Sequence, residues 1–194
     1  MKDFWNQRYA ENEYAYGKEG NLFLKEQLSA LDAKSMLLPA DGQGRNACMA
    51  ALMGVEAKAF DYSLSGKERA EKLATELGVN IDFECCAAED FHSEQLYDVL
   101  GLIYAHLPNR QAFHQKMLSY VKPGGTIILE AFSKQQIGKT SGGPQTDAML
   151  FSKEELEADF ADCSSIEITE TETVLNEGQY HEGLASVIRM VAVR

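Results

Sequence analysis

Positive charge and proline are scarce in this sequence of 194 residues. Eighteen lysines and arginines stand against thirty aspartates and glutamates, which gives a formal net charge of −12. An acidic excess of that size repels phosphate backbones, so we expect no nucleic-acid partner. The chain has four prolines, no Pro-, Ser- or Gly-rich stretch that would mark a linker, and no internal repeat. We therefore expect a single domain over residues 1–194.

Long apolar runs and paired cysteines are also missing. No stretch approaches the roughly 18–20 apolar residues that a membrane-spanning helix needs, and the N-terminus lacks the apolar core of a secretion signal. The four cysteines form no Cys-x-x-Cys pair and have no histidines at zinc-ligand spacing. We expect a cytoplasmic protein with free thiols, no metal site and no membrane partner.

Short apolar runs alternate with helical periods from about residue 34 onward. The runs predict strands at residues 35–38, 55–60, 79–86, 97–104 and 126–132. The periods predict helices at residues 47–53, 67–77 and 110–120, and one that opens at Ser152 with a capping box to Glu155.

The last third of the chain follows a different pattern. Two predicted strands, 165–175 and 184–193, are joined by a short polar link without a helix, so they must pair antiparallel. The final strand is apolar on both faces, which predicts a place inside the sheet. The whole pattern predicts an α/β fold: a Rossmann-like, mostly parallel sheet of seven strands with an antiparallel C-terminal strand and helices on both faces.

A glycine loop, Asp41-Gly42-Gln43-Gly44-Arg45-Asn46, follows the first predicted strand. Its glycines allow positive φ and close approach of a ligand, and the helix N-terminus after it favours anionic groups. Asp61 ends the second predicted strand, where a carboxylate suits the hydroxyls of a ribose. Ligands bind beyond the carboxyl ends of such strands. The spacing also leaves open a nicotinamide-dependent enzyme and a glycine turn that binds nothing.

Residues 37–47 resemble the first motif of class I S-adenosylmethionine (SAM)-dependent methyltransferases. The Gly44-Arg45-Asn46 version is similar to the branch that holds tellurite-resistance and thiopurine S-methyltransferase-like proteins. Other segments resemble family motifs in the same order, at residues 5–9, 59–63, 88–91, 97–99, 104–108, 122–125, 129–132, 142–144 and 177–183. The order and spacing of these segments carry the resemblance.

The resemblance implies SAM as cofactor and methyl transfer to a small molecule, with a thiol or another soft nucleophile as acceptor. The cofactor residues that it implies are Asp41, Gly42 and Gly44 at the methionine part, Arg45 and Asn46 in the same loop, Asp61 at the ribose, Tyr62, Ser63, Ala88 and Glu89 at the adenine, and Ile103 and Tyr104 bordering the ligand. Two departures stand out: Ala87 replaces an aspartate found in many relatives, and Pro39-Ala40 replaces an apolar–glycine pair. A SAM-binding protein without catalysis is the alternative function.

The acceptor side is predicted from where the loops fall. His106 follows the fourth strand, and the link at residues 176–183 brings His181 to the same face of the sheet. We predict that both histidines ring one opening with Gly142-Gly143-Pro144 and Glu177, as catalytic groups or as structural hydrogen-bonding groups.

An aromatic wall is expected beside the histidines, formed by Tyr16 in a catalytic position together with Trp5 and Tyr104. Residues 1–30 are expected to form an N-terminal helical segment that closes as a lid. We expect a monomer or a homodimer.

Overall fold

The computed structural model describes residues 2–194, and it has the predicted α/β architecture. The strands are β1 (Ser35–Pro39), β2 (Glu56–Asp61), β3 (Asp82–Cys85), β4 (Tyr97–Ile103), β5 (Val121–Phe132), β6 (Ser165–Asn176) and β7 (Glu182–Val193). The helices are α1 (Lys2–Glu11), α2 (Leu22–Ser29), α3 (Arg45–Leu52), α4 (Leu64–Leu77), α5 (Arg110–Leu118) and α6 (Lys153–Asp159).

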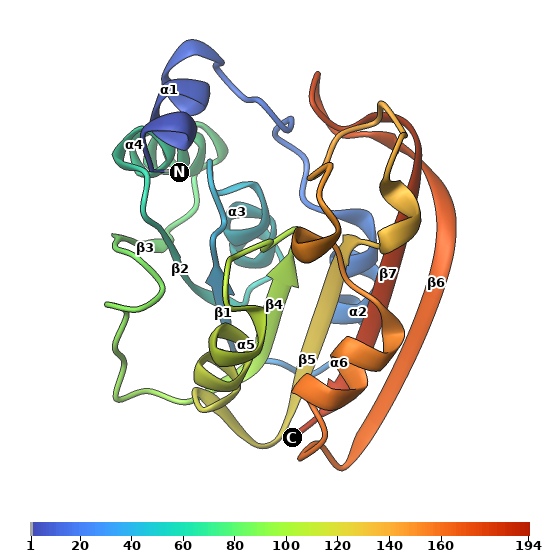
Figure 1. Cartoon of the computed structure of the whole chain (residues 1–194). Helices are drawn as coiled ribbons and strands as arrows, with labels where there is room; N and C mark the ends of the chain where they lie inside the picture. The colour runs from blue at the N-terminus through green and yellow to red at the C-terminus, as the bar shows by residue number, and fades with distance from the viewer. Residues whose placement is uncertain (1) are drawn as a thin grey trace.

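All seven strands belong to one sheet with the order β3-β2-β1-β4-β5-β7-β6 (Figure 1). Neighbours from β3 to β5 pair in parallel. Strand β7 lies between β5 and β6 and pairs antiparallel with both, as the sequence predicted. The carboxyl ends of β1, β2 and β4 therefore meet at one edge of the sheet, beside the switch point where β1 separates β2 from β4.

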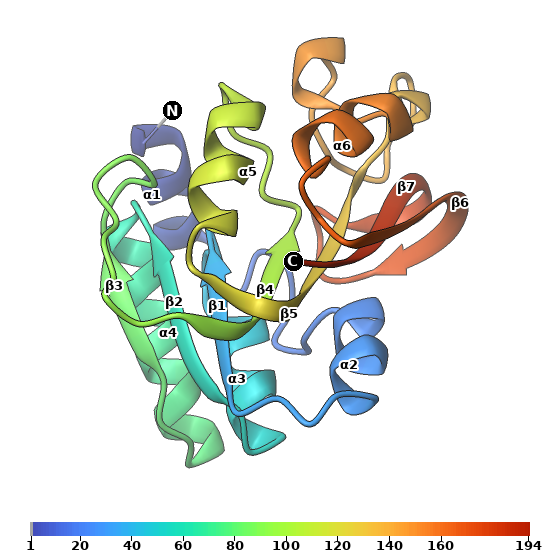
Figure 2. The same cartoon turned by 90° about the horizontal axis from the view of Figure 1, so that it is seen from below.

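Helices cover both faces of the sheet. Figure 2 shows α5 and α6 on one face and α2, α3 and α4 on the other. Alternate residues of β1 enter different cores: Met36 and Leu38 pack with the α2–α3 side, and Leu37 packs with the α5–α6 side. A strand buried on both faces is what an unbroken apolar run predicts.

Helix ends follow the local signals in most places. Gly78 ends α4 in the left-handed region at φ +67°, and Ser152 and Glu155 form the predicted capping box of α6. Helix α4 begins at Leu64, three residues before the predicted start, because Ser63 caps it by accepting the Gly66 N–H.

Two predicted strands differ in length from those observed. Strand β5 begins at Val121 rather than at residue 126, since Tyr97 pairs with Val121 and Val99 pairs with Thr126. Residues 122–125 lie opposite the single residue Asp98, so this bulge contains three extra residues, with Gly124 at φ +77°. Strand β3 begins at Asp82 rather than at residue 79, and it lies at the edge of the sheet.

No helix within residues 2–194 has the length and apolar character that crossing a bilayer requires. The four cysteines are free. Across the same residues, no group of three or more His, Cys, Asp or Glu side chains is close enough to hold a metal ion.

Candidate functional site

A cavity of about 480 Å³ lies beyond the carboxyl ends of β1, β2 and β4. Seven segments line it: residues within 4–17, 40–46, 61–62, 103–107, 142–149 and 180–181, together with Phe132. Such a volume lies in the range of about 300–1,000 Å³ that is common for small-molecule sites. The topology therefore places a ligand-sized space at the edge where the sequence predicted one.

Asp61 ties the end of β2 to the glycine loop. Its Oδ2 accepts the Gly42 N–H at 3.1 Å, and its Oδ1 accepts the Ser63 N–H at 2.9 Å. Burial raises the pKa of this carboxyl to about 6, although both hydrogen bonds favour its ionised form. Each carboxylate oxygen has a second lone pair, so Asp61 can also accept hydrogen bonds from a ligand in the cavity that it lines.

Asp41 holds the first turn of α3. Its Oδ1 accepts a hydrogen bond from Asn46 Nδ2 at 2.8 Å, and its Oδ2 accepts the Ala47 N–H at 3.1 Å. Burial raises the pKa of Asp41 to about 7. The Asn46 Oδ1 in turn accepts the Asn21 N–H at 2.9 Å, which fixes the start of α2 beside the loop.

The two glycines of the loop serve packing as well as turning. Gly42 and Gly44 have φ values of +56° and +80°. A Cβ on Gly44 would collide with the Cβ of Ala70 on α4, so this glycine lets α3 pack against α4. A Cβ on Gly42 would come within 2.6 Å of the Tyr9 hydroxyl, which lies over the loop. Ala40 also adopts a positive φ, +53°. The family that this sequence resembles has glycine at this position, and a positive φ at alanine strains the backbone.

Eight of the twelve predicted cofactor residues line the cavity: Asp41, Gly42, Arg45, Asn46, Asp61, Tyr62, Ile103 and Tyr104. The other four do not. Gly44 faces Ala70, and Ser63 is used as the cap of α4, where its hydroxyl donates to Asn6 Oδ1 at 2.7 Å. The carbonyls of Ala88 and Glu89 accept hydrogen bonds from Lys116 Nζ at 2.9 and 2.6 Å, which fixes this turn against α5.

Aromatic rings form one wall of the cavity, around His181. The ring of His181 lies 4.5 Å from Tyr16, 4.5 Å from Tyr104 and 5.1 Å from Phe132, centroid to centroid. The predicted residues Trp5, Tyr16 and Tyr104 all line the cavity. Phe132 and Tyr9 were missed. Two sequence signals could have identified them. Phe132 lies at the carboxyl end of β5, and Tyr9 lies one helical turn after Trp5.

His106 and His181 line the same cavity, as the prediction of a shared side requires. The two rings are held in different ways. His106 Nδ1 lies 2.6 Å from the Met149 carbonyl, and its Nε2 accepts the Phe132 N–H at 3.2 Å. Both nitrogens therefore bind main chain in the Nδ1–H tautomer, and burial lowers the pKa of His106 to about 4. With both nitrogens bound to main chain, this geometry favours the structural hydrogen-bonding role for His106 over the catalytic one.

His181 is oriented by a carboxylate. Its Nδ1 lies 3.3 Å from Glu177 Oε2, and its Nε2 has no hydrogen-bond partner among residues 2–194. Burial opposes ionisation of Glu177, but contacts from His181 and Arg45 outweigh it and lower the pKa of Glu177 to about 2. Arg45 Nη2 lies 3.0 Å from the same Oε2. Glu177 thus lies behind His181 rather than on the rim of the opening, where it was predicted.

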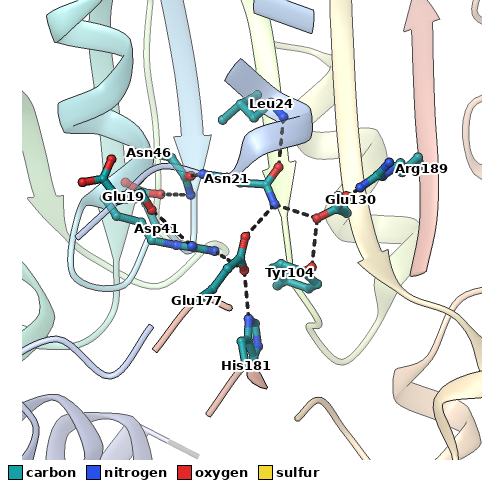
Figure 3. Close-up of polar contacts among 11 residues, drawn as sticks. Glu19, Asn21, Leu24, Asp41, Asn46, Tyr104, Glu130, Glu177, His181 and Arg189 are labelled. Atoms are coloured by element: carbon teal, nitrogen blue, oxygen red, sulfur yellow. Dashed lines mark hydrogen bonds and ion pairs between the residues drawn. The ribbon is translucent and has the colours of Figure 1, made fainter. Parts of the chain in front are cut away.

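A buried polar network supports this wall from outside the cavity (Figure 3). Glu130 accepts hydrogen bonds from the Tyr104 hydroxyl at 2.8 Å, Asn21 Nδ2 at 2.6 Å and Arg189 Nε at 2.6 Å. Asn21 Nδ2 also lies 3.2 Å from Glu177 Oε1. The network joins the carboxyl ends of β4 and β5, the interior of β7 and the β6–β7 link to the start of α2. Tyr104 within it has a φ of +51°. A lone glutamate within the apolar strand β5 is the network's one signal in the sequence.

Comparison with solved structures decides the fold. TehB from Haemophilus influenzae superposes with a TM-score of 0.72 at 16% identity, over 88% of this chain and 61% of that one. A SAM-dependent methyltransferase from Clostridium acetobutylicum superposes with a TM-score of 0.64 at 11% identity, over 99% and 92% of the two chains. The fold is that of the class I SAM-dependent methyltransferases.

A methyltransferase of this fold has been solved with a cofactor product. The plantazolicin methyltransferase BamL, in complex with S-adenosylhomocysteine (SAH), superposes with a TM-score of 0.65 at 13% identity, over 89% of this chain and 81% of that one. Among curated proteins, a ubiquinone biosynthesis O-methyltransferase of Rickettsia felis is 30% identical over 95 residues, which is 48% of this chain and 39% of that protein. The chain thus matches about two fifths of the length of this relative. No family model matches the chain.

Proposed function

We propose that this protein is a SAM-dependent methyltransferase that acts on a small-molecule acceptor. The observation that carries the proposal is the Asp61 carboxylate at the end of β2, which is hydrogen-bonded to the glycine loop and lines a cavity of about 480 Å³. The fold and the partial match to ubiquinone biosynthesis O-methyltransferases support it. The first structural test is whether the residues present fit the cofactor.

The chemistry of the lining suits SAM. Asp61 offers a carboxylate for ribose hydroxyls, and Tyr62 and Ile103 offer apolar surface beside it for an adenine. Asp41, Arg45 and Asn46 line the cavity beside them. Their negative and positive groups suit the ammonium and carboxylate of the methionine part of SAM. When bound, SAM supplies an electrophilic methyl group on a sulfonium centre. An aromatic surround suits that cationic centre.

The chain's own residues would align the acceptor and exclude water. Tyr16, Tyr104 and Phe132 form an apolar wall, and alignment within such a wall is the main contribution that a protein makes to a direct displacement. His181 stays neutral near pH 7, because burial lowers its pKa. With Nδ1–H donated to Glu177, its Nε2 is free to take a proton from the acceptor atom.

The proposed acceptor carries a thiol or another soft nucleophile, as the tellurite-resistance and thiopurine S-methyltransferase-like branch implies. The protein that converts a disulfide bond into a thioacetal group during echinomycin biosynthesis has a similar fold, with a TM-score of 0.78 at 15% identity, over 100% of this chain and 91% of that one. The pKa of a free thiol is about 8.5, so a small fraction is ionised near neutral pH. His181 would therefore need to accept only a weakly bound thiol proton. A SAM-binding protein without catalysis is the second candidate, and the aromatic half of the cavity beside His181 argues for catalysis.

The deciding experiment is calorimetric titration of the purified chain with SAM, SAH and NADH. We expect the two adenosyl ligands to bind in the micromolar range and NADH not to bind. Asp61→Ala should weaken SAH binding by about 1.5–3 kcal/mol, because charge-assisted hydrogen bonds to the ribose are lost. Asp90→Ala, which removes an exposed carboxylate away from the cavity, is the matched control. Failure of SAM and SAH to bind would contradict the proposal.

A further inference from the structure

Arg8 of α1 lines the aromatic end of the cavity. Its positive charge contrasts with the carboxylates at the glycine-loop end. Its guanidinium carbon lies 4.1 Å from the ring centroid of Tyr180 and 4.5 Å from that of Phe4. Its Nη1 donates to the Tyr16 hydroxyl at 2.9 Å. The guanidinium is thus held between α1 and the β6–β7 hairpin by aromatic groups.

No carboxylate pairs with Arg8 among residues 2–194, in a chain with thirty acidic side chains. Arg45, Arg110 and Arg189, by contrast, each have an acidic partner: Glu177, Asp159 and Glu130. Contacts to aromatic faces do not use N–H groups, and the Tyr16 hydroxyl takes only one of the five that a guanidinium offers. A half-buried cation with free donors at a cavity wall suits a carboxylate, which it can bind through two parallel hydrogen bonds.

We infer that Arg8 binds a carboxylate of the methyl acceptor, so that the acceptor is a small organic acid with an apolar or aromatic body. The inference rests on the proposed function. Tyr16 links the two ends of this subsite: its hydroxyl contacts Arg8, and its ring lies 4.5 Å from the ring of His181. When the carboxylate of an acceptor binds Arg8, the body of the acceptor, if it is the size of one aromatic ring, can extend along Tyr16 to His181.

Charge within the cavity favours the same orientation. Asp41 and Asp61 lie at the glycine-loop end, where the cation of Arg45 is already paired with Glu177. Arg8, which has no acidic partner among residues 2–194, lies at the aromatic end beside Trp5. An acceptor carboxylate is repelled by the first end and attracted by the second. The acid thus distinguishes the acceptor end of the cavity from the end that suits the cofactor.

The experiment uses matched pairs of probes that differ only in charge: 4-mercaptobenzoate with 4-mercaptobenzamide, and 4-hydroxybenzoate with 4-hydroxybenzamide. Each is titrated calorimetrically into the full chain, with and without saturating SAH. We expect the acids to bind about tenfold tighter than the amides, and Arg8→Gln to abolish that preference. Arg8→Lys should retain part of it, and Lys2→Gln, which removes an exposed charge from the same helix, should leave it unchanged.

Three results would overturn the inference: acids that bind no tighter than amides, acids that do not bind at millimolar concentration, or a preference that survives Arg8→Gln. A fourth concerns the cofactor's own carboxylate. If Arg8→Gln weakens SAH but not 5′-methylthioadenosine, which lacks the amino-acid end, Arg8 serves the cofactor and the acceptor assignment is wrong. Failure of the proposed function is read separately, as loss of SAH binding to the unaltered chain.

Discussion

At the scale of single residues, the buried carboxyls of Asp41 and Asp61 make ligand binding sensitive to pH. Burial raises their pKa values to about 7 and about 6. A ligand whose hydroxyl or ammonium groups donate hydrogen bonds favours the ionised carboxylates, so binding must release the protons that these groups hold. We expect the SAH affinity to fall as the pH falls from about 7.5 to about 5, approaching tenfold per pH unit for each carboxyl below its pKa.

Calorimetry at a series of pH values measures this dependence directly. In Asp61→Ala the lower step should vanish and the upper one should remain. A SAH affinity that stays constant over this range would show that neither carboxyl contacts the ligand as an ionised group. The unliganded chain has the opposite dependence: its stability from these two groups is present below about pH 4 and is lost as the pH rises through about 6 and 7, because folding raises both pKa values.

The two histidines of the cavity should respond differently to substitution. His106→Ala removes a buried ring that binds the Met149 carbonyl and the Phe132 N–H. We expect it to lower the free energy of unfolding by about 2–4 kcal/mol, as measured by urea titration. His181→Gln should chiefly reduce methyl transfer, because the Nε2 of His181 has no partner among the described residues. Equal loss of stability and equal loss of transfer in both variants would contradict this division.

At the scale of elements, the glycines at the two ends of α3 offer a matched pair of substitutions. Gly44 and Gly54 have φ values of +80° and +82°, so alanine is strained equally in both places. A Cβ meets Ala70 of α4 at Gly44 and meets nothing within 4 Å at Gly54. Gly54→Ala should cost about 1–2 kcal/mol of stability, and Gly44→Ala should cost about 1–3 kcal/mol more, because α3 must move from α4. Equal midpoints in urea would show that backbone strain alone matters.

The elements were predictable from the sequence where the signal is local. The apolar run of β1, the Gly78 cap and the Ser152–Glu155 capping box depend on residues a few positions apart, and each is observed. The early start of α4 was missed because the apolar period that predicts this helix begins at residue 70, whereas its start is set by the Ser63 cap. The bulge in β5 was missed because it depends on pairing with β4, which the sequence of residues 122–125 does not specify.

The site was predictable to the extent that strand ends define it. Residues directly after β1, β2 and β4 line the cavity as expected. Roles that depend on distant partners were not predictable. Lys116 donates hydrogen bonds to the carbonyls of Ala88 and Glu89. Glu177 forms an ion pair with Arg45. Charge and hydrogen-bond partners of this kind come from segments separated by tens of residues, and no spacing rule reports them.

At the scale of the whole molecule, hydrogen bonds attach the N-terminal segment to the glycine loop. Gln43 accepts the Ala15 N–H at 2.7 Å and donates to the carbonyls of Asn12 and Glu13, and Tyr9 is buried over Gly42. A ligand that orders this loop should therefore order residues 1–25 as a lid. We expect SAH to slow tryptic cleavage after Lys18.

The proteolysis is followed by mass spectrometry, with cleavage after Lys153 on α6 as the internal control. Residue Lys153 is exposed and lies outside the cavity lining, so its cleavage rate should not change. Equal rates after Lys18 with and without SAH would show that the segment does not respond to the ligand. Protection already complete without SAH would show that the lid is permanently closed.

A backbone contact between Gly17 and Gly178 joins the N-terminal segment to the link between β6 and β7. Both have positive φ, and a Cβ on Gly178 would lie 2.6 Å from the Gly17 nitrogen and 2.7 Å from the Ala15 carbonyl oxygen. A side chain at position 178 would therefore push the hairpin away from the N-terminal segment at this point. A Cβ on Gly17 would lie 3.6 Å from the Gly178 nitrogen, which is an ordinary contact, so only its φ of +73° favours glycine there. In evolutionary terms, related sequences that keep this contact should retain glycine at position 178, and those that lose it should be free to vary the hairpin length.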